Sequence, residues 1–164
     1  MASRLMGRLV PGLRWGLGRS LATEAAAKGP DMPFTFACPA AVFYKQQGVR
    51  QIDVPTFSGA FGILPNHVPT LAVLKPGVVT VTEEDGTAKK YFVSSGSVTV
   101  NEDSSVQVLA EEACVLEDID AAAAKEGLAE AQRSLNAAAD DVATAEAQIA
   151  VDTFEELLKA AGAK

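Results

Sequence analysis

Histidine and cysteine are scarce in this chain of 164 residues, which has one His and two Cys. A lone His67 cannot supply the histidine cluster of a zinc site, and Cys38 and Cys114 are too far apart for a CxxC pair. Two cysteines are also too few for a disulfide scaffold, so both are expected to act as small buried apolar side chains. The sequence therefore predicts no metal centre.

Basic residues are outnumbered, with 14 Lys and Arg against 21 Asp and Glu and a net charge of −7. Nucleic acids attract Lys and Arg to their phosphates, so this balance argues against a nucleic-acid partner. Phosphate-binding loops are missing too. Gly59 and Gly62 resemble part of one, but no GKS or GKT follows, and no GxGxxG follows a strand. We expect no bound cofactor.

Four of the arginines lie within residues 1–23, which contain no acid. Leucines recur there every four residues, on one stripe if the segment is helical: Leu5, Leu9, Leu13 and Leu17. An Arg-rich, acid-poor start is typical of a mitochondrial presequence, whereas a secretory signal needs an unbroken apolar region of about 7–15 residues. We interpret residues 1–22 as a presequence and residues 23–33 as a linker. A disordered basic tail is the alternative.

Residues 34–118 alternate short apolar runs with turn residues, which predicts an antiparallel β-sandwich. Valine pairs such as Val79 and Val81 are spaced by two and so lie on one face of a strand. The segments EEDG (83–86) and NEDSS (101–105) have the composition of hairpin turns. The large apolar residues expected in the sandwich include Phe36, Phe43, Phe57, Phe61, Leu64, Leu71, Leu74, Phe92 and Leu109.

Residues 119–164 are rich in Ala, Glu, Gln and Leu and contain no proline, which predicts two antiparallel helices in a hairpin. Asp118 or Asp120 can cap the first helix, and Asp140 or Asp141 the second. Asn136 can adopt the left-handed conformation that ends a helix, which gives helices of roughly 17 and 20 residues. The seven-residue spacing of Leu128, Leu135, Val142 and Ile149 could instead mark one long seam, but the segment NAAADD (136–141) interrupts it, so the hairpin is preferred.

An uncharged stretch at residues 54–74 has about the length of a membrane span, but its prolines and polar residues would break a helix in lipid. We expect no transmembrane segment, and interpret the stretch as a buried strand, a rigid turn and a second strand. Pro65 and Pro69 stiffen the turn. Pro76 and Gly77 suit positions i+1 and i+2 of a second turn.

His67 lies in this rigid turn. It could act as a general base only if a nucleophile, such as Ser58 or Thr70, and an orienting acid were brought to it. Loop histidines without such partners are mostly structural, and we expect a structural role for His67.

The segment GAFGILPNHVPTLAVLKPGVV (59–79) resembles the signature of the small central-stalk subunit of F-type ATP synthases, called delta in mitochondria and epsilon in bacteria and chloroplasts. FTFACPAAVFY is similar to the opening strand of that family, and DIDAAAAKEGLAEAQ to the start of its helical hairpin. The resemblance covers residues 34–161. Its signature residues, expected to be structural or at a subunit interface, are Gly62, Pro65, His67, Pro69, Pro76 and Gly77.

The resemblance implies a β-sandwich of about ten strands followed by a helical hairpin, in a rotor subunit without catalytic residues. Its implied partners are the gamma subunit, the mitochondrial epsilon subunit and the membrane c-ring, on the matrix side of the mitochondrial inner membrane. Such a subunit would link the gamma shaft to the c-ring, so that proton-driven rotation is coupled to ATP synthesis.

ATP binding by the second helix, which occurs in some bacterial relatives, is not expected, because residues 139–161 contain no arginine. Two alternatives remain from the residues alone. One is a matrix β-sandwich that binds a ligand or acts as a small enzyme, and the other is a free adaptor or chaperone-like module.

Overall fold

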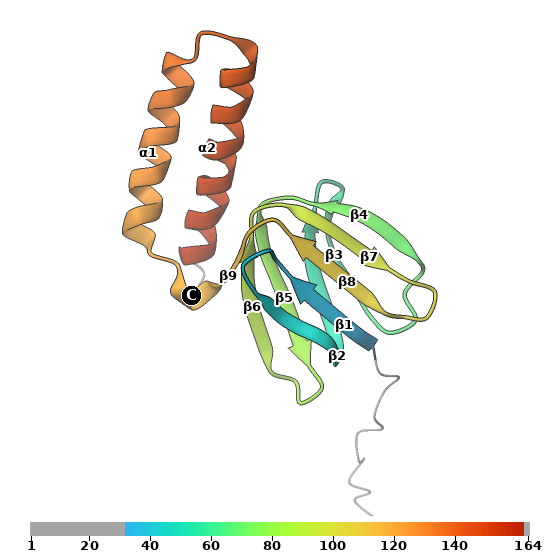
Figure 1. The fold of residues 1–164 in the computed structure, drawn as a ribbon. Coiled ribbons are helices and arrows are strands. Elements are labelled where there is room, and N and C mark those ends of the chain that lie inside the picture. The colour runs from blue at the N-terminus through green and yellow to red at the C-terminus, as the bar shows by residue number, and fades with distance from the viewer. Residues whose placement is uncertain (1–31, 163–164) are drawn as a thin grey trace, which may run out of the picture.

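The computed structural model describes residues 32–162, so the expected presequence and most of the expected linker lie outside the described residues. Nine strands are followed by a short 3₁₀ helix and two α-helices (Figure 1). The elements are β1 Met32–Ala37, β2 Val42–Thr56, β3 Gly59–Ile63, β4 Thr70–Leu74, β5 Gly77–Glu83, β6 Ala88–Val93, β7 Gly96–Val100, β8 Val106–Ala110, β9 Ala113–Val115, η1 Leu116–Asp118, α1 Ala121–Ala137 and α2 Asp141–Gly162. The predicted sandwich and hairpin are confirmed, with nine strands within residues 32–162.

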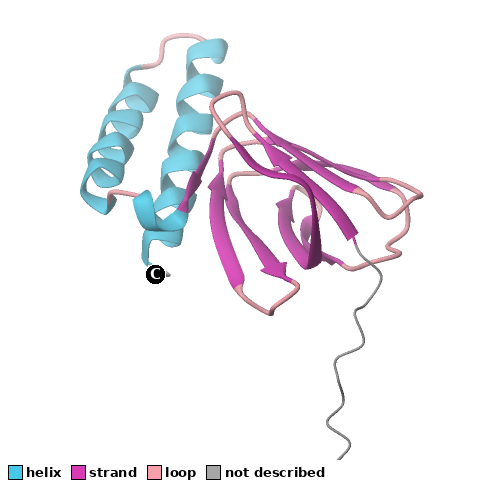
Figure 2. Cartoon of the chain, turned by 60° about the horizontal axis from the view of Figure 1, so that its bottom comes forward, coloured by secondary structure: helices cyan, strands magenta, loops and turns pink. Residues whose placement is uncertain are grey.

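The strands form two layers joined by the long strand β2 (Figures 1 and 2). One layer has the order β1-β8-β7-β4, and the other places β5, β6 and β9 beside β2, with β3 also paired to β2. The first half of β2 pairs with β1 and its second half with β5. One pair, β1 with β8, is parallel rather than antiparallel. These two strands are far apart in the sequence, so no tight turn constrains their relative direction.

The core between the layers consists of aliphatic and aromatic side chains from both. Large side chains that are fully or almost fully buried include Met32, Phe34, Phe36, Ile52, Ile63 and Leu74. Aromatic rings are in mutual contact there, with Phe36 lying 4.9 Å from Phe43 and 5.3 Å from Tyr91, measured between ring centroids. A core packed in this way gives a rigid sandwich.

Both predicted hairpin turns are confirmed. At EEDG, the Glu83 amide donates to the Thr87 carbonyl at 2.9 Å, and Gly86 has a φ of +88°. At NEDSS, the Asn101 amide donates to the Ser105 carbonyl at 2.9 Å, and Ser104 takes the left-handed conformation.

Aspartates cap both helices, as predicted. The Asp120 carboxylate accepts from the Ala122 amide at 2.8 Å, and the Asp140 carboxylate accepts from the Ala143 amide at 2.6 Å. The prediction for Asn136 was wrong, because it lies inside α1 and has no positive φ. The helix runs one residue further, and an extended Ala138 then leads directly into the second cap.

The preference for two helices over one long seam is confirmed, and the seam residues Val142 and Ile149 are 67% and 65% exposed. The chain reverses between the helices, so a spacing counted along the sequence does not continue on the same face. The residues that are buried within the two helices are mostly small: Ala124, Ala131, Ala147, Val151 and Ala160.

The end of α2 attaches the hairpin to the outer face of the layer that contains β5, β6 and β9 (Figure 2). The contact is a small apolar cluster of Phe92, Leu116, Ile119 and Ala160, with Val78, Cys114, Leu157 and Ala161 packed against it. No helix within residues 32–162 is long and apolar enough to cross a membrane.

Candidate interaction surface

The signature turn between β3 and β4 is a tight turn that proline and asparagine stabilise. The His67 amide donates to the Leu64 carbonyl at 3.1 Å, and Asn66 has a φ of +63°. Proline at the second position and a left-handed asparagine at the third are the features of a type II turn. Pro65 therefore holds the chain reversal, while Pro69 follows in the segment that leads into β4.

This turn is fastened to the β7–β8 turn. The Asn66 amide donates to Ser104 Oγ at 3.2 Å, and the Ser104 hydroxyl in turn donates to Asn66 Oδ1 at 3.3 Å. Both residues have positive φ, so two left-handed turns face each other. The contact fixes the end of the sandwich from which Leu64 and Val68 project.

His67 is half-buried and has packing contacts. Its ring stacks on Phe61 at 5.9 Å between centroids, and its Nδ1 donates to the Val68 carbonyl at 2.9 Å. The Thr70 hydroxyl donates to the same carbonyl, not to the imidazole. Within residues 32–162, no hydroxyl or carboxylate is recorded as a hydrogen-bond partner of this ring. The geometry thus gives His67 a role in shaping the turn.

At both Gly62 and Gly77, a Cβ would come close to a neighbouring side chain. A Cβ on Gly62 would lie 2.8 Å from Asp53 Oδ1, which accepts from Gln51 Nε2. A Cβ on Gly77 would lie 3.1 Å from the Pro55 ring. The turn role proposed for Gly77 was wrong: it is the buried first residue of β5 and lacks the positive φ of a type II turn. Contact with Pro55, rather than backbone conformation, explains this glycine.

The outer face of the β1-β8-β7-β4 layer is free of charge. The strand register places Ala37, Leu109, Ser97 and Val73 in one row across the four strands. The same register gives a second row of Thr35, Gln107, Thr99 and Leu71. An uncharged sheet face is unusual on a chain in which 21% of residues are charged.

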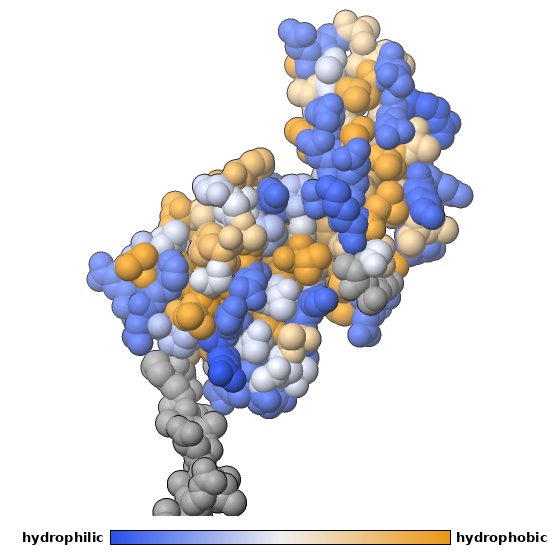
Figure 3. All heavy atoms as spheres, turned by 180° about the vertical axis from the view of Figure 1, so that it is seen from behind, coloured by the Kyte–Doolittle hydropathy of each residue, from blue (hydrophilic) through white to orange (hydrophobic). Residues whose placement is uncertain are grey.

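Large apolar side chains project from this face and its margin. We define the apolar patch as Phe57, Leu71, Val73 and Leu109, which are 76%, 77%, 60% and 53% exposed. Phe57 adjoins β4, because its amide donates to the Val73 carbonyl at 3.4 Å. Leu64 and Val68, 53% and 69% exposed, add apolar surface at the β3–β4 turn. Apolar residues also reach the surface elsewhere on both parts of the molecule (Figure 3).

The patch corrects the interpretation of the uncharged stretch as beginning with a buried strand. β3 and β4 each bury their last residue, Ile63 and Leu74, completely, and only Phe61 and Ala72 among their other apolar residues pack partly against the core. Phe57, Leu64, Leu71 and Leu109 are therefore not core residues. A strand with apolar residues on both faces reads as buried from sequence alone, because the alternation that marks a solvent face is missing.

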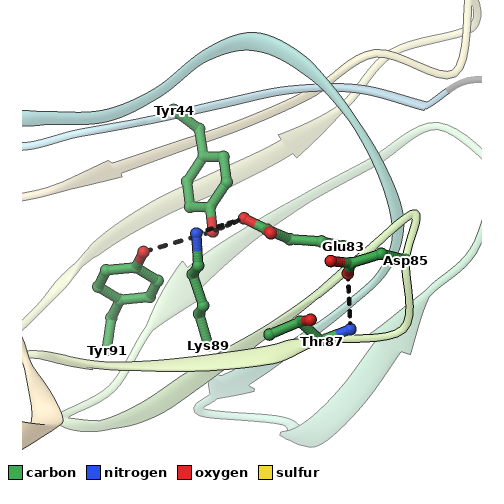
Figure 4. A network of polar contacts seen from close by, with 6 residues as sticks. All are labelled: Tyr44, Glu83, Asp85, Thr87, Lys89 and Tyr91. Carbon is green, nitrogen blue, oxygen red and sulfur yellow. Dashed lines mark hydrogen bonds and ion pairs between the residues drawn. The ribbon is translucent and has the colours of Figure 1, made fainter.

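A polar network that the sequence did not reveal lies at the opposite layer (Figure 4). The Tyr91 hydroxyl donates to the Tyr44 hydroxyl at 3.3 Å, which donates to Glu83 Oε1 at 3.1 Å. Lys89 Nζ pairs with the same Glu83 oxygen at 2.7 Å. Burial, followed by the bond to Tyr91 and the nearby Glu83, raises the pKa of Tyr44 above its usual value. The Tyr44 phenol therefore stays neutral, and the network ties β2, β5 and β6 together.

Within residues 32–162, no group of three or more His, Cys, Asp or Glu side chains could hold a metal ion. Cys38 is buried and Cys114 half-buried, and both thiols are free. Burial, with a smaller contribution from Asp118, raises the pKa of Cys114. The fold and surface define a class of protein: a rigid β-sandwich with an exposed apolar patch and a helical hairpin, suited to contacts with other chains.

Comparisons with known proteins agree with this description. Residues 31–115 match the family model described as the beta-sandwich domain of the ATP synthase delta/epsilon chain. The chain is 48% identical over 145 residues to the mitochondrial ATP synthase subunit delta of Caenorhabditis elegans, covering 88% of each chain. It is 41% identical over 134 residues to the subunit of that name from Saccharomyces cerevisiae, covering 82% of each. The chain belongs to the delta/epsilon family of ATP synthase subunits.

Solved structures share the fold. A chain in the Euglena gracilis mitochondrial ATP synthase (OSCP/F1/c-ring, rotational state 1) matches with a TM-score of 0.73 and 27% identity, over 93% of this chain and 90% of that one. A chain in the central stalk/c-ring structure of the Tetrahymena thermophila mitochondrial ATP synthase has a TM-score of 0.67. This match covers 82% of the present chain and 99% of the Tetrahymena chain, and at 16% identity it shows the fold alone.

Proposed function

We propose that this chain is a non-catalytic central-stalk subunit of mitochondrial F-type ATP synthase. In this role it links the gamma shaft to the c-ring and contacts the epsilon subunit, so that proton-driven rotation is coupled to ATP synthesis. The relatives named as mitochondrial subunit delta support the assignment to this complex. The observation that carries the mechanical role is the uncharged outer face with its apolar patch.

The physical argument rests on solvent exposure. Four large apolar side chains that are each more than half exposed favour removal from water, at about 25 cal/mol per Å² buried. The other residues of the two rows are uncharged, so a partner can cover them without removing an ionised group from water. A partner chain that covers this face supplies that burial. The rigid core behind it then transmits force rather than deforming.

Position at the membrane follows from the proposed c-ring contact, on the matrix side of the inner membrane, without a membrane-spanning segment. Residues 1–22 are proposed as the presequence that directs import, and residues 23–33 as a linker. A chain lacking residues 1–22 should fold normally but should no longer be imported by isolated mitochondria. Import of the shortened chain at full efficiency would contradict the presequence.

Assembly is the direct test of the proposed function. Blue-native electrophoresis of mitochondria, with detection of this chain, should show it co-migrating with the whole ATP synthase. The purified chain alone should neither hydrolyse ATP nor retain a nucleotide. Migration of the chain as a free small protein would favour an adaptor, and turnover by the isolated chain would favour the small matrix enzyme.

A further inference from the structure

Strand β6, in the layer that contains β5 and β9, is paired along only part of its outer edge. β9 has three residues and pairs with β6 only at Tyr91, Phe92 and Val93. The first half of β6, residues 88–90, has β5 on one side, and no strand among residues 32–162 pairs with its other side. An edge strand with unpaired backbone groups is a template for another strand.

The direction of these backbone groups follows from the β5–β6 hairpin. The Glu83 amide donates to the Thr87 carbonyl, so residues 83 and 87 form a hydrogen-bonded pair. Antiparallel pairing alternates, which places the N–H and C=O of Ala88, opposite Thr82, on the side away from β5. Ala88 is exposed, and its backbone groups are therefore accessible at the open edge.

A depression of about 680 Å³ borders this edge. Its walls come from β6 on one side and from β9 and η1 on the other, and they combine apolar, cationic and acidic side chains. The lining residues are Thr87, Ala88, Lys89, Lys90, Tyr91, Val115, Leu116 and Glu117. The depression can thus accommodate side chains of a segment that runs along the edge.

The charged side chains at this edge are of both signs, with Lys89 and Lys90 from β6 and with Glu83 and Glu117. Lys89 and Lys90 are the only adjacent pair of basic residues in the sequence. Glu83 already neutralises Lys89, as shown in Figure 4. Lys90 is exposed and has no recorded ion pair within the described part of the chain. A small anion would therefore meet one available cation, whereas a peptide could combine one charge contact with backbone pairing.

We propose that the open edge of β6 binds an extended segment of a neighbouring subunit, with an acidic residue opposite Lys90, by β-strand addition. The segment pairs its backbone with Ala88, presents a carboxylate to Lys90 and places an apolar side chain in the depression beside Val115 and Leu116. Backbone pairing supplies affinity in this mode, and the alternating side chains supply specificity. This inference rests on the proposed membership of the ATP synthase.

Zero-length carbodiimide cross-linking of the purified synthase tests the charge contact, because it joins a lysine amine only to a carboxylate in direct contact. Mass spectrometry should find Lys90 joined to an Asp or Glu of another subunit. Lys90→Gln should abolish this product. The matched control, Lys125→Gln on α1, should leave it unchanged.

Hydrogen exchange tests the backbone pairing. In the synthase, the amides of Ala88 and Lys90, which face the open edge, should exchange about tenfold more slowly than in the free folded chain. Ala88→Pro should remove this protection without removing a β5 bond, because the lost N–H faces the open edge. Circular dichroism of the isolated variant checks that it is folded.

The outcomes separate this inference from the proposed function. A chain that assembles into the synthase, yet shows neither the Lys90 cross-link nor slowed exchange, overturns the strand addition alone. A chain absent from the synthase overturns the proposed function. Slowed exchange of the free chain in inorganic phosphate, to the level seen in the complex, would assign the site to a small anion and contradict the peptide.

Discussion

The sandwich and the hairpin bury their side chains in different ways. The sandwich encloses large residues such as Phe34, Phe36 and Ile52 completely, whereas the buried residues within the hairpin helices are four alanines and Val151. Hydrophobic stabilisation scales with the apolar area removed from water, so the sandwich holds most of it. The hairpin depends on close helix contact and on the small cluster at the end of α2. The sandwich is therefore expected to be stable by itself, whereas the hairpin is expected to depend on its contacts with the sandwich.

Separating the two parts should have the largest effect. A fragment of residues 32–118 should keep its β-sheet circular dichroism spectrum and still bind the gamma subunit. A fragment of residues 119–164 should lose nearly all its helix, because isolated helices of this length are marginal in water. A hairpin fragment that is fully helical and captures the shaft subunit alone would reverse the proposed division of labour.

Shortening one buried side chain in the sandwich and one in the hairpin should lower the free energy of unfolding by different amounts. Phe36→Ala removes a ring that contacts Phe34, Phe43 and Tyr91 and should lower the free energy of unfolding by about 3–5 kcal/mol. Val151→Ala in the hairpin should cost about 1–2 kcal/mol, because less volume is lost. Urea unfolding followed by circular dichroism measures both. Equal costs would mean that the hairpin contributes to stability as strongly as the sandwich.

The closest helix contact offers a finer test. Gly127 packs under the Phe154 ring, and a Cβ there would lie 2.5 Å from two ring carbons. Gly127→Ala should therefore destabilise the hairpin by about 1–3 kcal/mol despite the better helix propensity of alanine. Gly162→Ala, where a Cβ meets nothing within 4 Å, is the control and should be neutral or slightly stabilising. A stabilising Gly127→Ala would show that the helices separate easily.

The smallest expected effect concerns alkaline pH. The pKa of Tyr44 is raised in the folded chain, mainly by burial, so the folded state retains the proton that the unfolded state releases. This contribution is complete below pH 10, the usual tyrosine pKa, and is lost as the pH rises further. Tyr44→Phe should flatten the fall in stability above that pH. Identical slopes for the two proteins between pH 9 and about 11 would exclude Tyr44 as the cause.

Local signals predicted the parts of the fold that depend on short segments. Residues 83–86 and 101–105 form the expected turns, and Asp120 and Asp140 cap the helices. Each of these features depends on a few consecutive residues and on the chemistry of one turn or cap.

Features that join distant segments were not predictable in this way. The apolar patch combines β4 and β8, and the network of Tyr44, Glu83 and Tyr91 combines three strands. Apolar spacing did not separate Leu71, which faces solvent, from Leu74, which is buried, because both faces of β4 are apolar. The signature glycines Gly62 and Gly77 were identified by resemblance, but their close neighbours, Asp53 and Pro55, became apparent only in the folded structure.

The central claim is that the apolar patch of the sandwich docks this chain on the rotor. Leu71→Asp combined with Val73→Asp should leave the unfolding free energy nearly unchanged, because both side chains are more than half exposed. In mitochondria, blue-native electrophoresis should then show the folded double variant lost from the ATP synthase, while the equally exposed Val142→Asp on the hairpin remains in it. Normal incorporation of the double variant would contradict the account.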